Sequence, residues 1–321
     1  MKIAIIGTWH VHTQEYTQAI IDNCQAELTA VWDKDIQKAK AFAKEFGLNV
    51  TENYDDILND KTIDGVVICT ATNEHPEIIK KAAKAGKHIF TEKVLAFTKK
   101  EAEEICKGVE KFAGKFTICY FHLTLSKLIK LKELCDDGIF GQISYMRVRN
   151  VHAGASANWL PPHFYDKNQC GGGAMMDLGA HPMYILNYFL GEPISINSTF
   201  TKVTGKAVED NAVCTIEFKN GAIGVSETGF VSHNFPYTVE ISGTDGCAII
   251  SGDELKYTSK STNDKWITCD LPQDMPRPIH LWIDAVVNDT DAPFGTKSAI
   301  GLSNLMEGAY ISYEKGIKYI Y

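Results

Sequence analysis

The first 120 residues alternate between short, continuously apolar runs and longer amphipathic stretches. Buried strands are expected where the apolar runs occur: 2–7, 27–33, 64–71, 87–93 and 116–122. Helices are expected between them: 13–24, 36–46, 54–58, 75–85 and 98–112. The last helix has a capping box, because Glu101 follows Thr98 by three residues. Apolar strands separated by helices predict a parallel sheet covered on both faces.

From residue 122 onward the pattern changes to one of successive strands. Helices are expected at 126–135, 177–190, 280–287 and 298–315. The segments expected as strands are 143–151, 196–203, 211–218, 222–230, 236–243, 247–251 and 254–259. In 211–218, residues with odd numbers form a mixed polar face and those with even numbers an apolar face. This half is therefore expected to be an α+β domain with a large, mostly antiparallel open sheet.

The length of 321 residues suggests two domains, which we expect at 1–121 and 122–321, with the C-terminal helix packing back on the first. Lys and Arg total 32 against 40 Asp and Glu, which argues against a nucleic-acid partner. We see no signal peptide and no apolar run of membrane-spanning length, so no membrane association is expected. The nine scattered cysteines are expected to be mostly buried free thiols of a cytoplasmic protein.

The turn after the first strand begins at Gly7, and a helix is expected soon afterwards. In a Rossmann domain this turn holds the pyrophosphate of a dinucleotide at the helix N-terminus. Its usual fingerprint is G-x-G-x-x-G, but Trp9 and His12 occupy the second and third glycine positions, which predicts a slightly displaced turn. By motif alone, a tight turn after any parallel strand is an equally good interpretation. The residues expected to bind the cofactor here are Gly7, Thr8, Trp9, His10, Val11 and His12.

His10 and His12 can hydrogen-bond a phosphate group. We do not expect this pair to bind a metal, because no carboxylate or thiol lies nearby in the sequence. The second strand ends at Asp33, about 26 residues after Gly7, where the fingerprint expects an acid that binds the adenosine ribose. A carboxylate there would repel a 2′-phosphate, so Asp33 favours NAD over NADP, although the neighbouring Lys34 weakens that preference.

Three further stretches resemble the Gfo/Idh/MocA oxidoreductases, which include glucose–fructose oxidoreductase and inositol dehydrogenase. Cys69–Pro76 (CTATNEHP) is similar to the family's T-x-x-x-x-H loop, and Gly86–Val94 (GKHIFTEKV) to its G-K-H-V-x-x-E-K-P stretch. Gly171–His181 (GGGAMMDLGAH) matches its G-G-G-x-x-x-D-x-G-x-H motif. The resemblance covers essentially the whole chain, and the third motif is highly specific.

The resemblance implies that Lys93, Asp177 and His181 form the active site. Lys93 follows a parallel strand, where doubly wound folds bind ligands. Asp177 and His181 are four residues apart, so they would share one face of a helix, provided that the helix starts or kinks near Pro182. The other residues expected to contact the cofactor are Asp33, Lys34, Thr70, Ala71, Thr72, Asn73, His75, Glu92 and Lys93.

Three departures from the family surround the expected substrate site. Val94 replaces a proline that often follows a cis peptide, Tyr184 replaces an acid, and His122 with Leu123 replaces an arginine. These changes put the common sugar and inositol specificities in doubt. The candidate substrate-binding residues are Tyr120, His122, Trp159, His163, Tyr165, Asp177 and His181. Trp159 is equally compatible with a hydrophobic plug.

Together these features predict an NAD-dependent dehydrogenase that acts on a secondary alcohol of a sugar, inositol or related polyol. One alternative is a redox-neutral reaction on a glycoside with tightly bound NAD, in which oxidation, elimination or hydrolysis, and re-reduction follow one another. A second alternative is a non-catalytic NAD-binding regulator, which the retained Lys93, Asp177 and His181 disfavour. A homodimer or homotetramer is expected to form through the open sheet.

Overall fold

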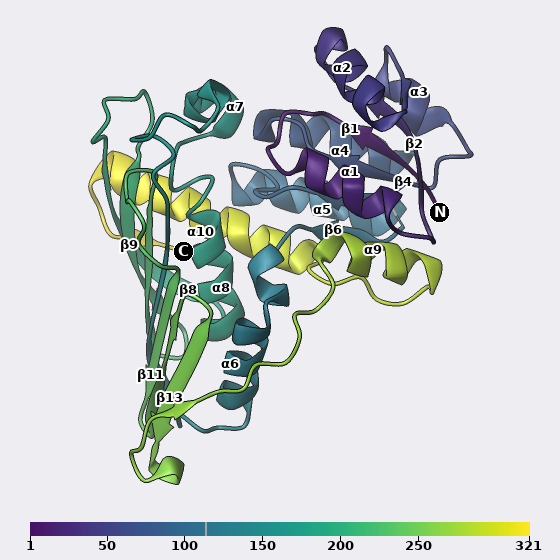
Figure 1. Cartoon of the computed structure of the whole chain (residues 1–321). Helices are drawn as coiled ribbons and strands as arrows, with labels where there is room; N and C mark the ends of the chain where they lie inside the picture. Colours follow the sequence, from purple (N-terminus) through teal and green to yellow (C-terminus); the bar gives the residue numbers. More distant parts are fainter. Residues whose placement is uncertain (113) are drawn as a thin grey trace. The chain divides into compact units, whose positions relative to one another are not determined.

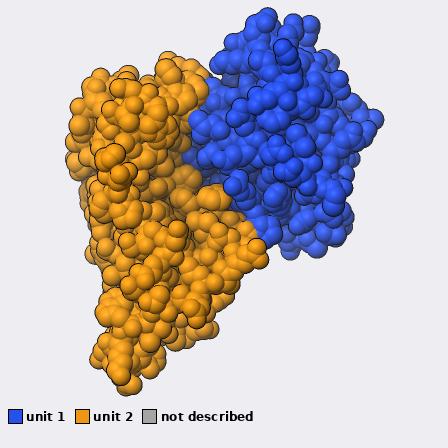
Figure 2. All heavy atoms as spheres, viewed as in Figure 1, with its two compact units in different colours: residues 1–120, 276–303 blue, residues 121–275, 304–321 orange. Residues whose placement is uncertain are grey.

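The computed structural model describes residues 1–112 and 114–321, which divide into two compact units (Figure 1, Figure 2). Unit 1 comprises Met1–Tyr120 and Pro276–Ser303, and unit 2 comprises Phe121–Met275 and Asn304–Tyr321. The first change of unit lies one residue from the expected boundary. Residues 276–303, which the sequence analysis assigned to the second domain, belong instead to unit 1.

Unit 1 contains a six-stranded parallel sheet in the order β3-β2-β1-β4-β5-β6. Its strands are β1 (Lys2–Ile6), β2 (Glu27–Trp32), β3 (Asn49–Val50), β4 (Gly65–Ile68), β5 (His88–Thr91) and β6 (Phe116–Ile118). All four residues of β4 are buried, as a strand covered on both faces requires. The predicted α/β Rossmann architecture is confirmed.

Some helices of unit 1 begin or end with local signals that the sequence carries. The α-helices are α1 (Thr13–Ile21), α2 (Ile36–Phe46), α3 (Tyr54–Asn59), α4 (His75–Lys84), α5 (Lys99–Phe112) and α9 (Pro278–Val287), with the 3₁₀ turn η1 (Thr72–Glu74). The side chain of Asp35 caps α2, which ends at the left-handed Gly47. The Glu101 N–H donates to Thr98 Oγ1 at 3.2 Å, as the predicted capping box requires.

Helix α9 belongs to unit 1 because its apolar face packs on the core of the Rossmann sheet. Trp282 is completely buried in a cluster with Ile3 and Phe90, and the Phe90 and Trp282 ring centroids are 5.9 Å apart. The indole Nε1–H donates to the Lys115 carbonyl at 3.4 Å. A segment that is distant in sequence thus completes the first hydrophobic core.

Unit 2 contains a nine-stranded sheet in the order β14-β13-β12-β11-β7-β10-β9-β8-β15. All strand pairs found in this sheet are antiparallel except β7 with β10. The strands are β7 (Ile143–Val151), β8 (Pro193–Thr201), β9 (Asn211–Phe218), β10 (Ile223–Gly229), β11 (Thr238–Gly243), β12 (Gly246–Ser251), β13 (Glu254–Ser259), β14 (Ile267–Thr268) and β15 (Tyr319–Ile320). The predicted mostly antiparallel sheet is confirmed.

Helices lie against one face of this sheet. Unit 2 contains η2 (Phe121–Thr124), α6 (Ser126–Asp136), η3 (Pro162–Tyr165), α7 (Lys167–Cys170), α8 (Ala180–Leu190) and η4 (Lys260–Thr262), while the residues of α10 (Thr296–Lys315) are divided between the units. Along β9, burial alternates at every residue, as predicted. The α8 residue Leu186 packs over β10, where a Cβ at Gly224 would lie 3.2 Å from its side chain.

The other face of the sheet remains exposed in the single chain. Val213 and Ile223 are exposed apolar residues on it. Arg147 on β7 forms a bidentate ion pair with Glu227 on β10 at 2.8 Å. It also donates a hydrogen bond to Glu240 on β11 at 2.9 Å. None of the helices in the described part of the chain is long and apolar enough to cross a membrane.

Replacing Trp282 with alanine should destabilise unit 1 by about 3–5 kcal/mol, because a large, fully buried side chain is lost from the Rossmann core. Urea unfolding followed by circular dichroism measures the change. Val287→Ala is the matched control, since Val287 lies on the same helix and is 42% exposed. If the two substitutions lowered the free energy of unfolding equally, the assignment of α9 to the Rossmann core would be contradicted.

Candidate active site

Gly7, the residue that follows β1, has a conformation and a neighbour that only glycine tolerates. Its φ is +91°, and a Cβ would lie 2.7 Å from the backbone nitrogen of Thr70. The carboxyl ends of β1 and β4 therefore touch at this point. Thr70 Oγ1 is buried and has no hydrogen-bond partner among the described residues. A close backbone turn beside an unsatisfied hydroxyl fits the phosphate region of a dinucleotide.

Asp33, which follows β2, holds the nucleotide turn by its side chain. Its Oδ2 accepts hydrogen bonds from both the backbone N–H and the hydroxyl of Thr8, each at 2.6 Å. Its Oδ1 accepts from the Asp35 N–H at 2.8 Å. Lys34 points into an exposed ion pair with Glu74 at 3.0 Å. Asp33 therefore anchors the turn in addition to the ribose-binding role that the sequence analysis expected.

Glu92, which follows β5, is the central acceptor of the cofactor half. Its carboxylate is 1% exposed, and Oε1 accepts a hydrogen bond from the Tyr16 hydroxyl. The same oxygen lies 3.5 Å from Nδ1 of His10 and 3.5 Å from Nδ1 of His12. The second oxygen, Oε2, accepts the backbone N–H of Lys93 at 3.1 Å. One buried carboxylate thus joins the nucleotide turn, helix α1 and the expected catalytic lysine.

The charges of this cluster shift the pKa values of its members. Burial alone would raise the pKa of Glu92, but His10, His12 and Lys93 together hold it well below its usual range, so the group stays ionised. Burial would lower the pKa of His12, but its hydrogen bond and charge interaction with Glu92 outweigh that effect and raise the pKa above 6.5. The cluster therefore favours a carboxylate beside a protonated imidazole.

The structure changes the reasoning about a metal at this turn. No carboxylate lies near this turn in the sequence, so no metal was expected, yet the fold brings Glu92 close, and the donor atoms of His10, His12 and Glu92 lie within 4.8 Å of one another. Those atoms have other partners, however. Oε1 of Glu92 already accepts the Tyr16 hydroxyl, and Oε2 accepts the Lys93 N–H at 3.1 Å. The geometry favours a hydrogen-bonded ion pair over a cation site.

His75 ties the loop after β4 to the segment that carries Lys93. Its ring is buried, with Nδ1 3.0 Å from the Val94 carbonyl and Nε2 3.3 Å from the Thr70 carbonyl. Burial lowers the pKa of this imidazole, even though both carbonyls raise it. Lys93 itself is buried, and the peptide bond between Lys93 and Val94 is cis.

The remaining residues expected in the cofactor half occupy varied positions. Ala71 and Thr72 are buried, whereas Val11 and Asn73 are exposed and Trp9 is partly exposed. Tyr120, expected to bind substrate, is buried in unit 1, where its hydroxyl donates to the Ser298 carbonyl at 2.9 Å. These contacts are those of a core residue.

In unit 2, the glycine-rich motif is held by Glu209, which the sequence analysis missed. Oε1 of this buried residue accepts the N–H groups of Gly173 at 2.8 Å and Met175 at 3.1 Å, and the Tyr310 hydroxyl at 2.5 Å. A Cβ at Gly172 would lie 1.8 Å from the Tyr310 hydroxyl. The glycines therefore allow a close approach to Glu209 and Tyr310. Glu209 is about 35 residues from the motif, and no spacing rule connects the two.

The helix expected at 177–190 starts three residues later than predicted, so Asp177 and His181 do not lie on one helix. Helix α8 begins at Ala180, and Asp177 lies in the turn before it. Gly179 precedes the helix, and its N–H donates to the Ala174 carbonyl at 2.8 Å, while Pro182 fits the first turn, where its missing N–H has no intrahelical partner to lose. Asp177 is therefore oriented by the turn rather than by the helix.

His181 lies in a cluster of rings. Its Nδ1 is 2.9 Å from the Tyr184 hydroxyl, which accepts the backbone N–H of His122 at 3.2 Å. The ring of His122 lies 4.5 Å from that of His181 and 5.0 Å from that of Tyr237, measured between centroids. The buried Tyr237 hydroxyl has no hydrogen-bond partner among the described residues, which makes Tyr237 a candidate that the sequence did not reveal.

The irregular segment before the glycine motif carries the other substrate candidates. Trp159 is 57% exposed and packs on His152 with centroids 4.7 Å apart, so it does not plug a core. His163 and Tyr165 lie in η3, and the Tyr165 hydroxyl donates to the Gly154 carbonyl at 3.5 Å. Lys93 thus belongs to unit 1, and the other expected catalytic and substrate residues, apart from Tyr120, belong to unit 2.

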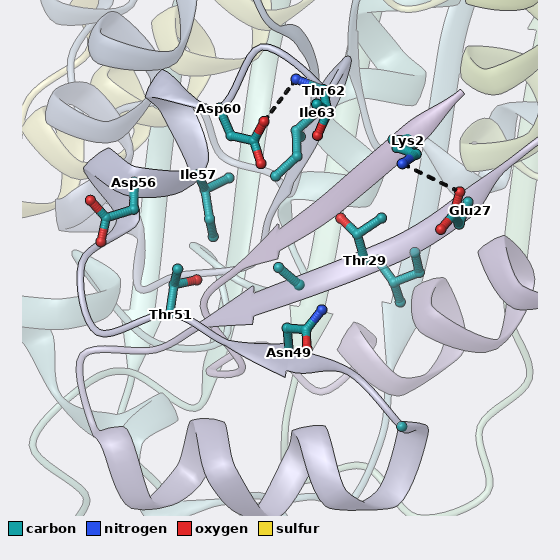
Figure 3. Close-up of a pocket in the computed structure, with 13 residues that line it drawn as sticks. Lys2, Glu27, Thr29, Asn49, Thr51, Asp56, Ile57, Asp60, Thr62 and Ile63 are labelled. Atoms are coloured by element: carbon teal, nitrogen blue, oxygen red, sulfur yellow. Dashed lines mark hydrogen bonds and ion pairs between the residues drawn. The ribbon is translucent and has the colours of Figure 1, made fainter.

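A cavity of about 550 Å³ in unit 1 contains none of these residues (Figure 3). It is lined by the first residues of β1 and β2, Lys2 and Glu27, and by Asp56 and Asp60 near α3. These strand starts lie at the end of the sheet opposite the carboxyl ends that carry Gly7 and Asp33. The cavity is therefore separate from the cofactor region.

Two curated proteins of known activity are similar to this chain. The D-glucoside 3-dehydrogenase of Escherichia coli (strain K12) is 29% identical over 248 residues, covering 72% of this chain and 70% of that protein. The scyllo-inositol 2-dehydrogenase (NAD(+)) of Bacillus subtilis (strain 168) is 29% identical over 260 residues, covering 78% of this chain and 73% of that protein.

The fold is also that of a levoglucosan dehydrogenase solved in complex with NADH and levoglucosan. The TM-score is 0.87 at 21% identity, with 100% of this chain and 99% of that chain covered. Residues 1–119 match the family described as "Oxidoreductase family, NAD-binding Rossmann fold", and residues 128–249 match the "GFO/IDH/MocA C-terminal domain". The chain therefore belongs to the Gfo/Idh/MocA family of NAD-binding oxidoreductases.

Proposed function

We propose that the protein is a cytoplasmic NAD-dependent dehydrogenase that oxidises a secondary alcohol of a sugar, inositol or related polyol reversibly. The observation that carries the proposal is the retention of Lys93, Asp177 and His181 in a chain whose relatives are named glucoside and inositol dehydrogenases. Bound NAD supplies the hydride acceptor for the carbinol carbon. The protein's own residues handle the proton and the developing charge on oxygen.

In this mechanism, His181 accepts the hydroxyl proton as the substrate carbon loses its hydride, and the products are a ketone, NADH and a proton. Lys93 hydrogen-bonds the same oxygen and stabilises its developing negative charge. Asp177 orients the substrate and the imidazole. Tyr184, whose hydroxyl lies 2.9 Å from His181 Nδ1, fixes the ring without placing a formal charge beside it.

Trp159, His163, Tyr165 and His122 are the proposed substrate contacts. An exposed indole offers an apolar surface to a sugar face, and imidazole nitrogens bond hydroxyl groups. Tyr237 joins them because its buried hydroxyl lacks a partner among the described residues. The roles of Gly7, Asp33, Thr70 and Glu92 around the cofactor belong to the same proposal.

Lys93→Ala and His181→Ala should each lower kcat by about 10²–10⁴-fold with little change in NADH affinity, since each removes a group that acts on the proton or the oxygen. A panel of sugars, polyols and inositols followed at the NADH absorbance band identifies the substrate and then measures the loss. Lys100→Ala and His233→Ala are matched controls, because both residues are exposed. Wild-type turnover in either site variant would remove its assigned role, and turnover without net NADH would favour the redox-neutral alternative.

Asp33→Ala should weaken NAD binding and narrow the difference between NAD and NADP, because it removes both the anchor of Thr8 and the charge that repels a 2′-phosphate. Asp33→Asn separates the two effects, since an amide oxygen still accepts hydrogen bonds but carries no charge. Calorimetry with both cofactors measures them. A wild-type protein that binds NADP more tightly than NAD would contradict the ribose-binding role of Asp33.

The exposed face of the second sheet is our proposed contact between subunits. It combines apolar residues such as Val213 and Ile223 with the Arg147 ion-pair network, a mixture typical of a partly wet interface. Light scattering should therefore report a dimer or tetramer, and Ile223→Lys should shift it toward monomer. Lys100→Ala should leave the mass unchanged. A monomeric wild-type protein at micromolar concentration would contradict this proposal.

A further inference from the structure

His12 occupies a special place at the end of the nucleotide turn. It is the residue before helix α1, and no side chain caps the first turn of that helix. Its side chain is 40% exposed, while its Nδ1 lies 3.5 Å from the buried Oε1 of Glu92. One edge of the imidazole therefore faces a buried anion, and the rest of the ring remains accessible to a ligand.

We infer that His12 binds the phosphate groups of NAD as an imidazolium, with the buried Glu92 carboxylate as its fixed counter-ion. This inference rests on the NAD-binding part of the proposed function and is independent of the roles given to Lys93 and His181. It goes beyond that function by giving the nucleotide turn a positive charge, on His12, and by explaining why Glu92 is ionised.

The sequence of the turn explains why a cation is needed. In the fingerprint, glycines let the backbone approach the phosphates, but Trp9 and His12 carry side chains at two of those positions. The segment 7–14 contains no lysine or arginine, and the first charged residue of α1 is the acidic Glu15. A charge-assisted bond from His12, added to the amides at the start of α1, compensates for the missing approach.

The groups that face His12 come from three places. Burial is the largest single effect and lowers the pKa of His12, and the charge of Lys93 after β5 lowers it further. The hydrogen bond and charge of Glu92 after β5, together with the charge of Glu15 on α1, outweigh both and raise the pKa above 6.5. The rings of His10 and Tyr16 pack against it with centroids 4.8 Å and 6.2 Å away. Because His12 loses its proton as pH rises through this raised pKa, its contribution to NAD binding is complete below that value and is lost above it.

NADH fluorescence titrations from pH 6 to pH 9 at constant ionic strength test the inference without a substrate. The wild-type Kd should rise roughly 10- to 100-fold across the titration, the effect of losing one charge-assisted hydrogen bond. In His12→Gln the Kd should equal the high-pH wild-type value at every pH. In Glu92→Gln the loss should occur at lower pH, because the counter-ion is gone. His280→Gln, a histidine of α9 in the same unit, should behave as wild type.

Ligands that are parts of NADH show which part of the cofactor is responsible for the pH dependence of binding. ADP-ribose carries the pyrophosphate and should show the same pH dependence as NADH, whereas adenosine should show none. A flat wild-type profile, a pH-dependent His12→Gln variant, or pH-dependent adenosine binding would each overturn the inference. Binding that is lost after EDTA treatment and restored by Zn²⁺ would also overturn it, since a metal would then occupy the cluster. His12→Gln decides the matter if Glu92→Gln does not fold, and the Lys93→Ala and His181→Ala assays report separately on catalysis.

Discussion

The cofactor half of this protein depends on one buried carboxylate. An ionised group that is 1% exposed is stable only when donors and positive charge surround it, and Glu92 obtains these from Tyr16, His10, His12 and the Lys93 backbone. Those residues come from the nucleotide turn, helix α1 and the end of β5. The need to satisfy one charge therefore fixes the turn, the helix and the expected catalytic lysine in a single arrangement.

Unit 2 has the same construction with different residues. Glu209 is buried and accepts two backbone N–H groups and a tyrosine hydroxyl, which holds the glycine-rich loop ahead of Asp177 and His181. A glycine-rich loop makes few packing contacts of its own, because glycine has no side chain. A buried carboxylate supplies several strong hydrogen bonds from one residue and so restricts such a loop.

The sequence predicted what local rules control and missed what distant contacts control. Periodicity identified the parallel strands and the alternation of β9, and the Thr98 cap and the turn at Gly7 were found because each is signalled by residues adjacent in the sequence. The start of α8 was misplaced because a helical spacing was read across Gly179. Glu92 and Glu209 were not recognised as organising residues, since their partners lie about 35 to 80 residues away and are joined to them only by the fold.

Two of the three departures from the family pattern are in contact. Tyr184 stands where an acid is common and His122 where an arginine is common, and the Tyr184 hydroxyl accepts the His122 N–H beside the ring of His181. Replacing an acid and an arginine together removes one negative and one positive charge, so the net charge of this cluster is unchanged. Tyr237, the next ring, adds a hydroxyl and no charge. A cluster of imidazoles and phenols can exchange hydrogen bonds with neutral hydroxyl groups, and Lys127 borders it, with its Nζ 5.2 Å from the centroid of the Tyr237 ring.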